Sequence, residues 1–233
     1  MWSLEIMRWF GWFLVGYYLM ACQEAPVDSA LHSTTDSVSI SLLALGDSYT
    51  VGQGVQISER FPAQLQNILR TKGIKTRHVG YLAQSGWTSA ELDQALSNSN
   101  PGLHDYVSVL IGVNDQFQGL DSAQYVKKLA SILVKAVGLA QGINEHVIVI
   151  SIPDYGLTPI GLLLDTAKIH REIDGFNRIN QRLAKQNQCR YVNITEIGRA
   201  ARYNPTYTSA DGLHPSAEAY RSWAEAIAPS LRL

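Results

Sequence analysis

Ser48, Asp211 and His214 are the residues of this 233-residue chain whose types could together perform nucleophilic chemistry. A serine hydroxyl is a weak nucleophile unless a base removes its proton, and histidine is the usual base because its pKa lies near neutral pH. A carboxylate on the second ring nitrogen fixes the tautomer and the orientation of such a histidine. Asp211 and His214 are three residues apart, so a single loop can bring them together. The set predicts acyl transfer through Ser48.

Acyl transfer also needs hydrogen-bond donors for the negative charge that develops on the attacked carbonyl oxygen. The backbone amides of Ser48 and Gly86 and the side chain of Asn114 are the available donors. Gly86 has no side chain that would block a close approach to its N–H. We therefore predict an oxyanion hole formed by these three residues.

The element that must position Ser48 is a strand over residues 38–45, which ends at Gly46. An apolar run closed by a glycine is typical of a strand buried on both faces of a parallel sheet. Ligands of such sheets bind beyond the carboxyl ends of the strands, where Ser48 would lie. By itself, the Gly-Asp-Ser tripeptide is equally consistent with a polar turn that has no catalytic role. We expect Asp47 to cap this loop and not to take part in the chemistry.

Strands and helices alternate along the rest of the chain. Further strands are predicted at 77–83, 106–111, 147–152 and 191–194, and the main helices at 58–73, 88–100, 122–141, 168–188 and from Pro215 onward. Pro215 suits the first position of the last helix. This order predicts an α/β fold, a flavodoxin-like three-layer α/β/α sandwich around a five-stranded parallel sheet.

Four short blocks along the domain resemble the SGNH (GDSL) hydrolase family. They stand in the family's order, each after a predicted strand or before a predicted helix: Gly46-Asp47-Ser48-Tyr49, the glycine loop at Gly86, Gly112-Val113-Asn114-Asp115 and Asp211-Gly212-Leu213-His214. Tyr49 stands where the older family name has a leucine. The Gly-x-Ser-x-Gly elbow of the α/β-hydrolases is absent from the sequence.

The resemblance implies a serine ester hydrolase. Ser48 would be the nucleophile, His214 the general base and then acid, and Asp211 the residue that orients the histidine, with Ser48, Gly86 and Asn114 as the oxyanion hole. The candidate substrates are acetylated carbohydrates, lysophospholipids, thioesters and short acyl esters. An acyltransferase on the same fold, or a glycan- or lipid-binding surface lipoprotein without turnover, are the alternatives.

Four aromatic residues neighbour these blocks or the strand ends, and they are candidates for the wall of a substrate pocket: Tyr49, Trp87, Phe117 and Tyr155. Aromatic rings there could hold an acyl chain or stack on a sugar. Each is as consistent with an ordinary core position.

Composition and motifs limit which partners, cofactors and metals are expected. The formal net charge is -1, so nucleic acid is not an expected partner. The glycines after Val51 lack the spacing of a dinucleotide fingerprint, so no cofactor is expected. His170 and Asp174 share a helix face, and we expect a surface pair and no metal site, because no third ligand is evident.

Residues 1–21 carry an apolar block that follows Arg8 and suits the core of a signal peptide. Leu19-Met20-Ala21-Cys22 resembles a bacterial lipobox, which implies lipid modification of Cys22. Residues 22–37 then form a polar tether, and residues 38–233 the hydrolase domain. The protein is expected to be exported and membrane-anchored, in the periplasm or at the outer membrane. A plain cleaved signal and an uncleaved anchor are the alternatives.

Overall fold

A single parallel sheet organises the domain. The structure is a computed structural model that describes residues 39–232. The five strands lie in the order β2-β1-β3-β4-β5. Their bounds are β1 (Ser39–Gly46), β2 (Lys75–Ala83), β3 (Tyr106–Leu110), β4 (Val147–Ile150) and β5 (Arg190–Val192). This is the strand order of flavodoxin-like sheets, which confirms the predicted α/β fold.

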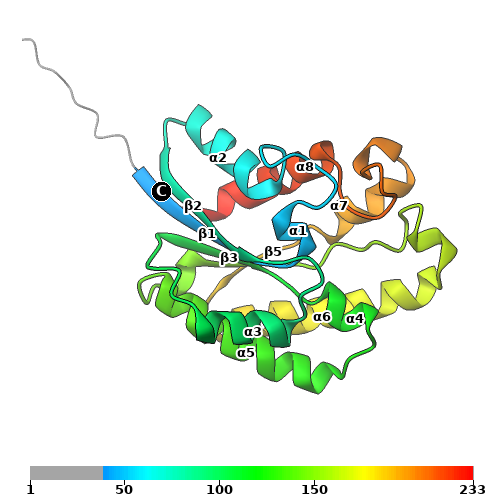
Figure 1. Cartoon of the computed structure of the whole chain (residues 1–233), viewed down its shortest axis with the longest axis horizontal. Coiled ribbons are helices and arrows are strands. Elements are labelled where there is room, and N and C mark those ends of the chain that lie inside the picture. Colours follow the sequence, from blue (N-terminus) through cyan, green and yellow to red (C-terminus); the bar gives the residue numbers. More distant parts are fainter. Residues whose placement is uncertain (1–38, 233) are drawn as a thin grey trace, which may run out of the picture. The chain divides into compact units, whose positions relative to one another are not determined.

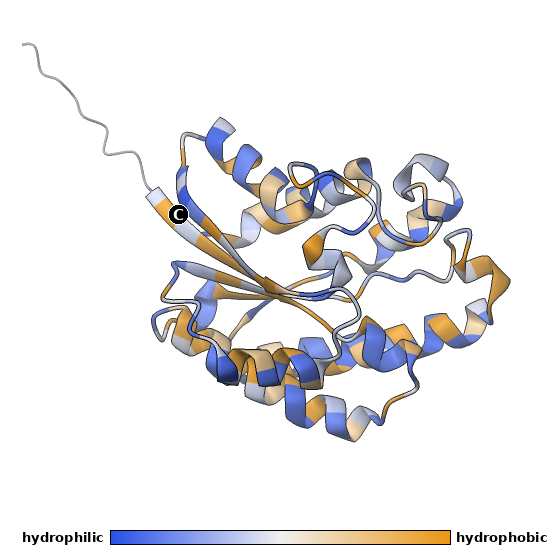
Figure 2. Cartoon of the chain, in the orientation of Figure 1, coloured by the Kyte–Doolittle hydropathy of each residue, from blue (hydrophilic) through white to orange (hydrophobic). Residues whose placement is uncertain are grey.

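Helices cover both faces of the sheet (Figure 1). α2 (Phe61–Thr71) and α8 (Ala217–Ile227) pack together on one face, while α3 (Ser89–Asn98), α5 (Ser122–Leu139) and α6 (Thr166–Gln186) cover the other. Figure 2 shows how hydropathy follows this arrangement: the central strands are hydrophobic, and the helices alternate between polar and apolar residues. The central strands must be apolar because both of their faces are shielded from water.

Three short helices follow strand ends and were not predicted from the sequence. α1 (Ser48–Val51) follows β1, α4 (Val113–Phe117) follows β3, and α7 (Thr195–Arg199) follows β5. Each is four or five residues long. Such short elements give no helical periodicity in a sequence, because the pattern needs several turns to emerge.

The start of the last helix differs from the prediction. α8 begins at Ala217, and Ser216 is its N-cap, since the Ser216 hydroxyl accepts a hydrogen bond from the backbone N–H of Ala219. Pro215 lies before the cap and forms an isolated antiparallel bridge with Thr208. A serine can satisfy a free amide of the first helical turn and a proline cannot, so the cap takes the position next to the helix.

The predicted signal segment (1–21), the tether (22–37) and residue 38 lie outside the described residues. Between residues 39 and 232, the structure contains no helix with the length and apolar character needed to cross a membrane.

Candidate active site

Ser48 lies at the carboxyl end of β1 and is the first residue of α1. As predicted, Asp47 acts as a cap, because its Oδ1 accepts a hydrogen bond of 3.0 Å from the backbone N–H of Tyr49. Gly46 allows the tight exit from the strand, since a Cβ there would lie 2.3 Å from the carbonyl oxygen of Leu110. Gly-Asp-Ser therefore carries the chain directly from a central strand into a helix.

His214 reaches Ser48 from the loop that precedes α8, although the two residues are 166 positions apart in the sequence. The Nε2 atom of His214 lies 3.1 Å from the hydroxyl oxygen of Ser48, and its Nδ1 lies 2.7 Å from Oδ2 of Asp211. Both Ser48 and His214 are buried. The three residues singled out in the sequence thus form one continuous chain of hydrogen bonds.

The Asp211 carboxylate keeps its charge although it stands beside a buried histidine. Burial alone would raise the pKa of Asp211, but hydrogen bonds from the backbone N–H groups of Leu213 and His214, from the His214 ring and from the Ser209 hydroxyl outweigh burial and lower it to about 2. A carboxylate that stays ionised can hold Nδ1–H of the histidine and leave Nε2 free to accept a proton.

Gly86 and Asn114 face the same site. Both line one cavity with Ser48 and His214. The amide Nδ2 of Asn114 donates a 2.9 Å hydrogen bond to the carbonyl oxygen of Trp87, which ties α4 to the loop after β2. A second N–H remains on the same nitrogen. Gly86 has a φ of +86°, a conformation that favours glycine.

The cavity at Ser48 has a volume of about 340 Å³. Tyr49, Phe117 and Tyr155 line it, as the sequence suggested for three of the four aromatic candidates. Trp87 is not among the lining residues: its side chain packs partly against the core, and its contact with the site runs through its backbone carbonyl.

Asp47, next to Ser48 in the chain, is a buried carboxyl group with one unpaired oxygen. Its side chain is fully buried, and Oδ2 has no hydrogen-bond partner among the described residues. Burial raises the pKa of Asp47 to about 7, and the nearby charge of Asp115 adds to the shift, although the hydrogen bond from Tyr49 opposes it.

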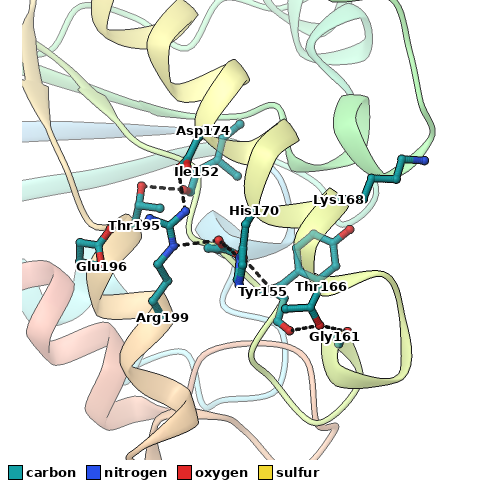
Figure 3. A network of polar contacts seen from close by, with 12 residues as sticks. Ile152, Tyr155, Gly161, Thr166, Lys168, His170, Asp174, Thr195, Glu196 and Arg199 are labelled. Carbon is teal, nitrogen blue, oxygen red and sulfur yellow. Dashed lines mark hydrogen bonds and ion pairs between the residues drawn. The ribbon is translucent and has the colours of Figure 1, made fainter.

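The predicted pairing of His170 with Asp174 is wrong. His170 Nδ1 lies 2.5 Å from Oδ2 of the buried Asp154, and Arg199 Nε lies 3.0 Å from the same oxygen. Asp174 instead accepts a hydrogen bond from Arg199, as Figure 3 shows. The sequence spacing placed His170 and Asp174 on one helix face, but Asp154 and Arg199 lie closer to their side chains in the fold.

Residues 44–222 match the model of the GDSL-like lipase/acylhydrolase family. The chain belongs to this family. The matched segment begins in β1 and ends in α8, so it contains Ser48, Gly86, Asn114, Asp211 and His214.

Relatives of this GDSL-like protein are named as esterases. Esterase TesA of Pseudomonas aeruginosa is 29% identical over 204 residues, which cover 85% of this chain and 91% of that protein. An arylesterase of Vibrio mimicus is 27% identical over 205 residues, covering 85% and 92%. A crystal structure of TesA is similar with a TM-score of 0.63 at 26% identity, covering 82% of this chain and 98% of that one. The chain is accordingly a carboxylic ester hydrolase with the SGNH hydrolase fold.

Sequence reasoning missed part of the site of this esterase. Ile160 and Leu164 line the cavity from the loop between β4 and α6, and the sequence showed them only as members of an apolar run without periodicity. The run Ile160-Gly161-Leu162-Leu163-Leu164 was nevertheless a usable signal, because so many aliphatic residues are unusual in a loop that follows a strand.

Proposed function

We propose that the protein hydrolyses carboxylic esters through an acyl-enzyme on Ser48. The observation that carries the proposal is the hydrogen-bonded chain from Asp211 through His214 to Ser48, which opens onto the cavity. Nucleophile, base and orienting carboxylate stand in the order that serine hydrolysis requires.

In the first step, the Ser48 oxygen attacks the ester carbonyl while Nε2 of His214 takes its proton. The charge on the imidazolium is stabilised by Asp211, whose pKa of about 2 keeps it ionised at neutral pH. His214 then passes the proton to the leaving alcohol as the C–O bond breaks, and the acyl group remains on Ser48.

The oxyanion of the tetrahedral intermediate is proposed to lie between Gly86 and Asn114. The backbone N–H of Ser48 stands at the start of α1, where helix amides have no intrahelical partner. The Gly86 amide and the remaining N–H of Asn114 supply the other donors. Asn114 is held by its bond to Trp87, so this donor is fixed before the substrate arrives.

In the second step, a water molecule takes the place of the alcohol. His214 removes a proton from the water, the resulting hydroxide attacks the acyl carbon, and the proton is returned to Ser48 as the acid leaves. The enzyme ends each cycle in its starting protonation state.

Labelling with a fluorophosphonate tests the assignment of the nucleophile. We expect the wild-type protein to be labelled covalently, and Ser48→Ala to lose both labelling and p-nitrophenyl acetate hydrolysis. Ser58→Ala is the matched control, because Ser58 is exposed and lies outside the cavity. Labelling that persists in Ser48→Ala contradicts the proposal, and a wild-type protein that binds lipids or glycans but is inert to the probe favours a binding lipoprotein.

We also propose that the protein is exported and anchored through acyl chains on Cys22. The Leu19-Met20-Ala21-Cys22 sequence supports this, and stable anchoring needs more than one chain. A fatty-acid probe fed to expressing cells should label the wild-type protein and not Cys22→Ser. Equal labelling of both proteins would exclude the anchor.

A further inference from the structure

The two edges of the parallel sheet differ in charge. The amino edge, where the strands begin, is formed by residues 70–77, 98–106, 139–147, 185–190 and 228–232. With histidine neutral, seven charged residues there are cationic and two are acidic: Arg70, Lys72, Lys75, Arg77, Lys185, Arg190 and Arg232 against Asp105 and Glu145. The amino edge therefore carries a net positive charge, although the formal net charge of the whole chain is -1.

The carboxyl edge, where Ser48 lies, has the opposite balance. It is formed by residues 46–60, 83–89, 111–122, 150–166 and 192–217. Eight charged residues there are acidic and three are cationic: Asp47, Glu59, Asp115, Asp121, Asp154, Asp165, Glu196 and Asp211 against Arg60, Arg199 and Arg202. The eight residues of β1, at about 3.3 Å each, separate the two edges by about 25 Å. The domain is thus an electrostatic dipole whose positive end lies opposite the nucleophile.

Contacts across the strand starts join the amino edge into one surface. Lys75 begins β2 and is the register partner of Ser39, the first residue of β1. The Tyr106 hydroxyl, at the start of β3, donates a 2.7 Å hydrogen bond to the carbonyl oxygen of Arg232. Figure 1 accordingly marks the end of the chain beside the start of β1. The cations at the carboxyl terminus and those between α2 and β2 therefore flank the same strand starts.

Three cations of the amino edge are free to act on a partner outside the chain. Arg70, Lys72 and Lys75 are exposed, and none of them forms an ion pair with a described residue. Arg77 lies next to them and is paired with Asp105. A cluster of exposed like charges without acidic neighbours produces a positive potential in the surrounding solvent, which attracts anions.

Helix ends account for only part of this charge. Cations are favourable at a helix C-terminus, and Arg70 and Lys185 are the basic residues in the last turns of α2 and α6. Lys75 and Arg77, however, belong to β2. A strand has no comparable dipole for a cation to offset. The stabilisation of helices therefore does not explain the whole cluster.

We propose that the amino edge is a docking surface for an anionic lipid bilayer. Each Lys or Arg close to such a bilayer strengthens binding about fivefold. The chain itself favours a membrane as the partner, because it enters the domain through Ser39 at this edge, 17 residues after the proposed lipidation site Cys22. At no more than about 3.6 Å per residue, an anchor at Cys22 keeps this edge within about 60 Å of the bilayer. The choice of partner rests on the proposed anchor and is independent of the chemistry of Ser48.

Docking through the amino edge determines which way the active site faces. Ser48 and its cavity lie at the carboxyl edge, on the far side of the sheet from Ser39. The acidic groups of the carboxyl edge are repelled by anionic headgroups, so the reverse orientation is disfavoured. In the docked domain, esters reach Ser48 from the aqueous side and not from the bilayer that holds the protein.

Lysine acetylation on vesicles tests the docking. The full chain is reconstituted with vesicles of phosphatidylcholine, with or without about 30% phosphatidylglycerol, and acetylated lysines are quantified by mass spectrometry. At about 0.05 M salt, Lys72 and Lys75 should react at least about fivefold more slowly on the anionic vesicles. The difference should vanish at about 0.5 M salt, where the Debye length is about 4 Å. Lys127 and Lys168 are internal controls, because both are exposed and lie outside the amino edge, and they should react equally on both kinds of vesicle.

Two double variants with the same change in charge locate the surface. Arg70→Gln/Lys72→Gln should weaken docking about 25-fold, because it removes two contributions of about fivefold each. The reactivity of Lys75, followed as the phosphatidylglycerol content is raised, measures this constant. Lys127→Gln/Lys168→Gln removes two charges from elsewhere and should change it less than about twofold. Equal effects of the two double variants refute a localised docking surface.

The outcomes separate this inference from the proposed anchor. If a wash in about 1 M salt leaves the protein on the vesicles but Lys72 and Lys75 react equally on both kinds, docking is refuted and the anchor stands. If the wash removes the protein, the anchor is refuted. Protection that still depends on phosphatidylglycerol then supports docking, and its absence refutes it.

Other partners of the amino edge give different results. Protection of Lys72 and Lys75 by heparin, but not by phosphatidylglycerol, overturns the proposal in favour of a soluble polyanion. Protection on pure phosphatidylcholine that grows with the density of protein overturns it in favour of the acidic edge of a second copy.

Discussion

The domain contains two aspartate–histidine pairs of similar geometry and different surroundings. In the loop before α8, Asp211 and His214 are 2.7 Å apart, and the Asp211 side chain is 36% exposed. In the second pair, Asp154 of the loop between β4 and α6 lies 2.5 Å from His170 of α6, and the Asp154 side chain is fully buried. The first pair continues to a serine, whereas the second continues to an arginine.

This difference separates a pair that can transfer a proton from a pair that holds a loop in place. His214 presents Nε2 to the Ser48 hydroxyl, so a proton can move along the chain. Asp154 shares one oxygen between His170 and Arg199 and accepts the Gly156 N–H on the other, which fixes the start of the loop that lines the cavity. Among the described residues, the hydrogen bonds of His170 involve Nδ1 alone. An aspartate–histidine contact is therefore uninformative until the second ring nitrogen is examined.

The largest expected contrast comes from replacing the two histidines in the same way. His214→Gln should lower kcat for p-nitrophenyl acetate roughly a million-fold, the size seen when the base of a serine protease triad is removed. His170→Gln should change it less than about tenfold, because His170 does not touch the reacting atoms. Steady-state kinetics on both purified variants measure the contrast. Comparable losses in the two variants would mean that the second pair takes part in the reaction.

Replacing the two aspartates should give the next largest contrast. Asp211→Asn preserves the shape of the loop but removes the charge that orients His214, and a loss of about 10⁴-fold in kcat is expected from the same change in a protease. Asp154→Asn should lower kcat far less. Because the pKa of Asp211 is about 2, its ionisation should not contribute to the pH–rate profile above about pH 4. Equal losses of kcat in Asp211→Asn and Asp154→Asn would contradict the orienting role of Asp211.

The two pairs also show what could be predicted from the sequence. Asp211 and His214 were recognisable because they sit three residues apart, and because Ser48 and Asn114 stand at strand ends that a parallel sheet brings together. Asp154, His170 and Arg199 come from a loop, a long helix and a short helix, and their meeting depends on how these elements pack. Local spacing favoured Asp174 for His170, and packing decided otherwise. For the same reason the strands and long helices were predicted, and the short helices and the apolar loop at the cavity were not.

The Asp154 pair, which we expect to matter little for kcat, should contribute clearly to the free energy of unfolding. Arg199→Met removes the guanidinium that pairs with the buried Asp154 carboxyl group, and we expect the free energy of unfolding to fall by about 3 kcal/mol. Arg221→Met is a matched control, because Arg221 is 71% exposed and its pair with Glu225 lies on the surface. The control should cost less than about 1 kcal/mol. Urea unfolding followed by circular dichroism measures both values. Equal losses would show that the pair of Arg199 with Asp154 stabilises the fold no more than a surface pair does.

Asp47 extends the comparison, because it is as buried as Asp154 but no described cationic side chain pairs with it. Its pKa of about 7 lies above the ordinary value of 3.8, so the folded state retains a proton that the unfolded state loses. Below about pH 4 both states are protonated and the carboxyl costs nothing. Stability should then fall as the pH rises from about 4 to about 7, and remain reduced above that.

Asp47→Asn tests this sign, since asparagine keeps the oxygen that caps α1 and cannot ionise. A shift from 3.8 to about 7 corresponds to about 4 kcal/mol of lost stability at pH 8. An unpaired amide N–H at the buried Oδ2 position would cost roughly 1–3 kcal/mol, so the net gain at pH 8 should be about 1–3 kcal/mol. At pH 4 that gain should vanish or reverse, because the wild-type carboxyl is then neutral as well. Thermal unfolding of both proteins at the two pH values decides the matter: a variant that is less stable than wild type by the same amount at both would show that Asp47 is ionised in the folded protein, with its charge stabilised by contacts other than an ion pair.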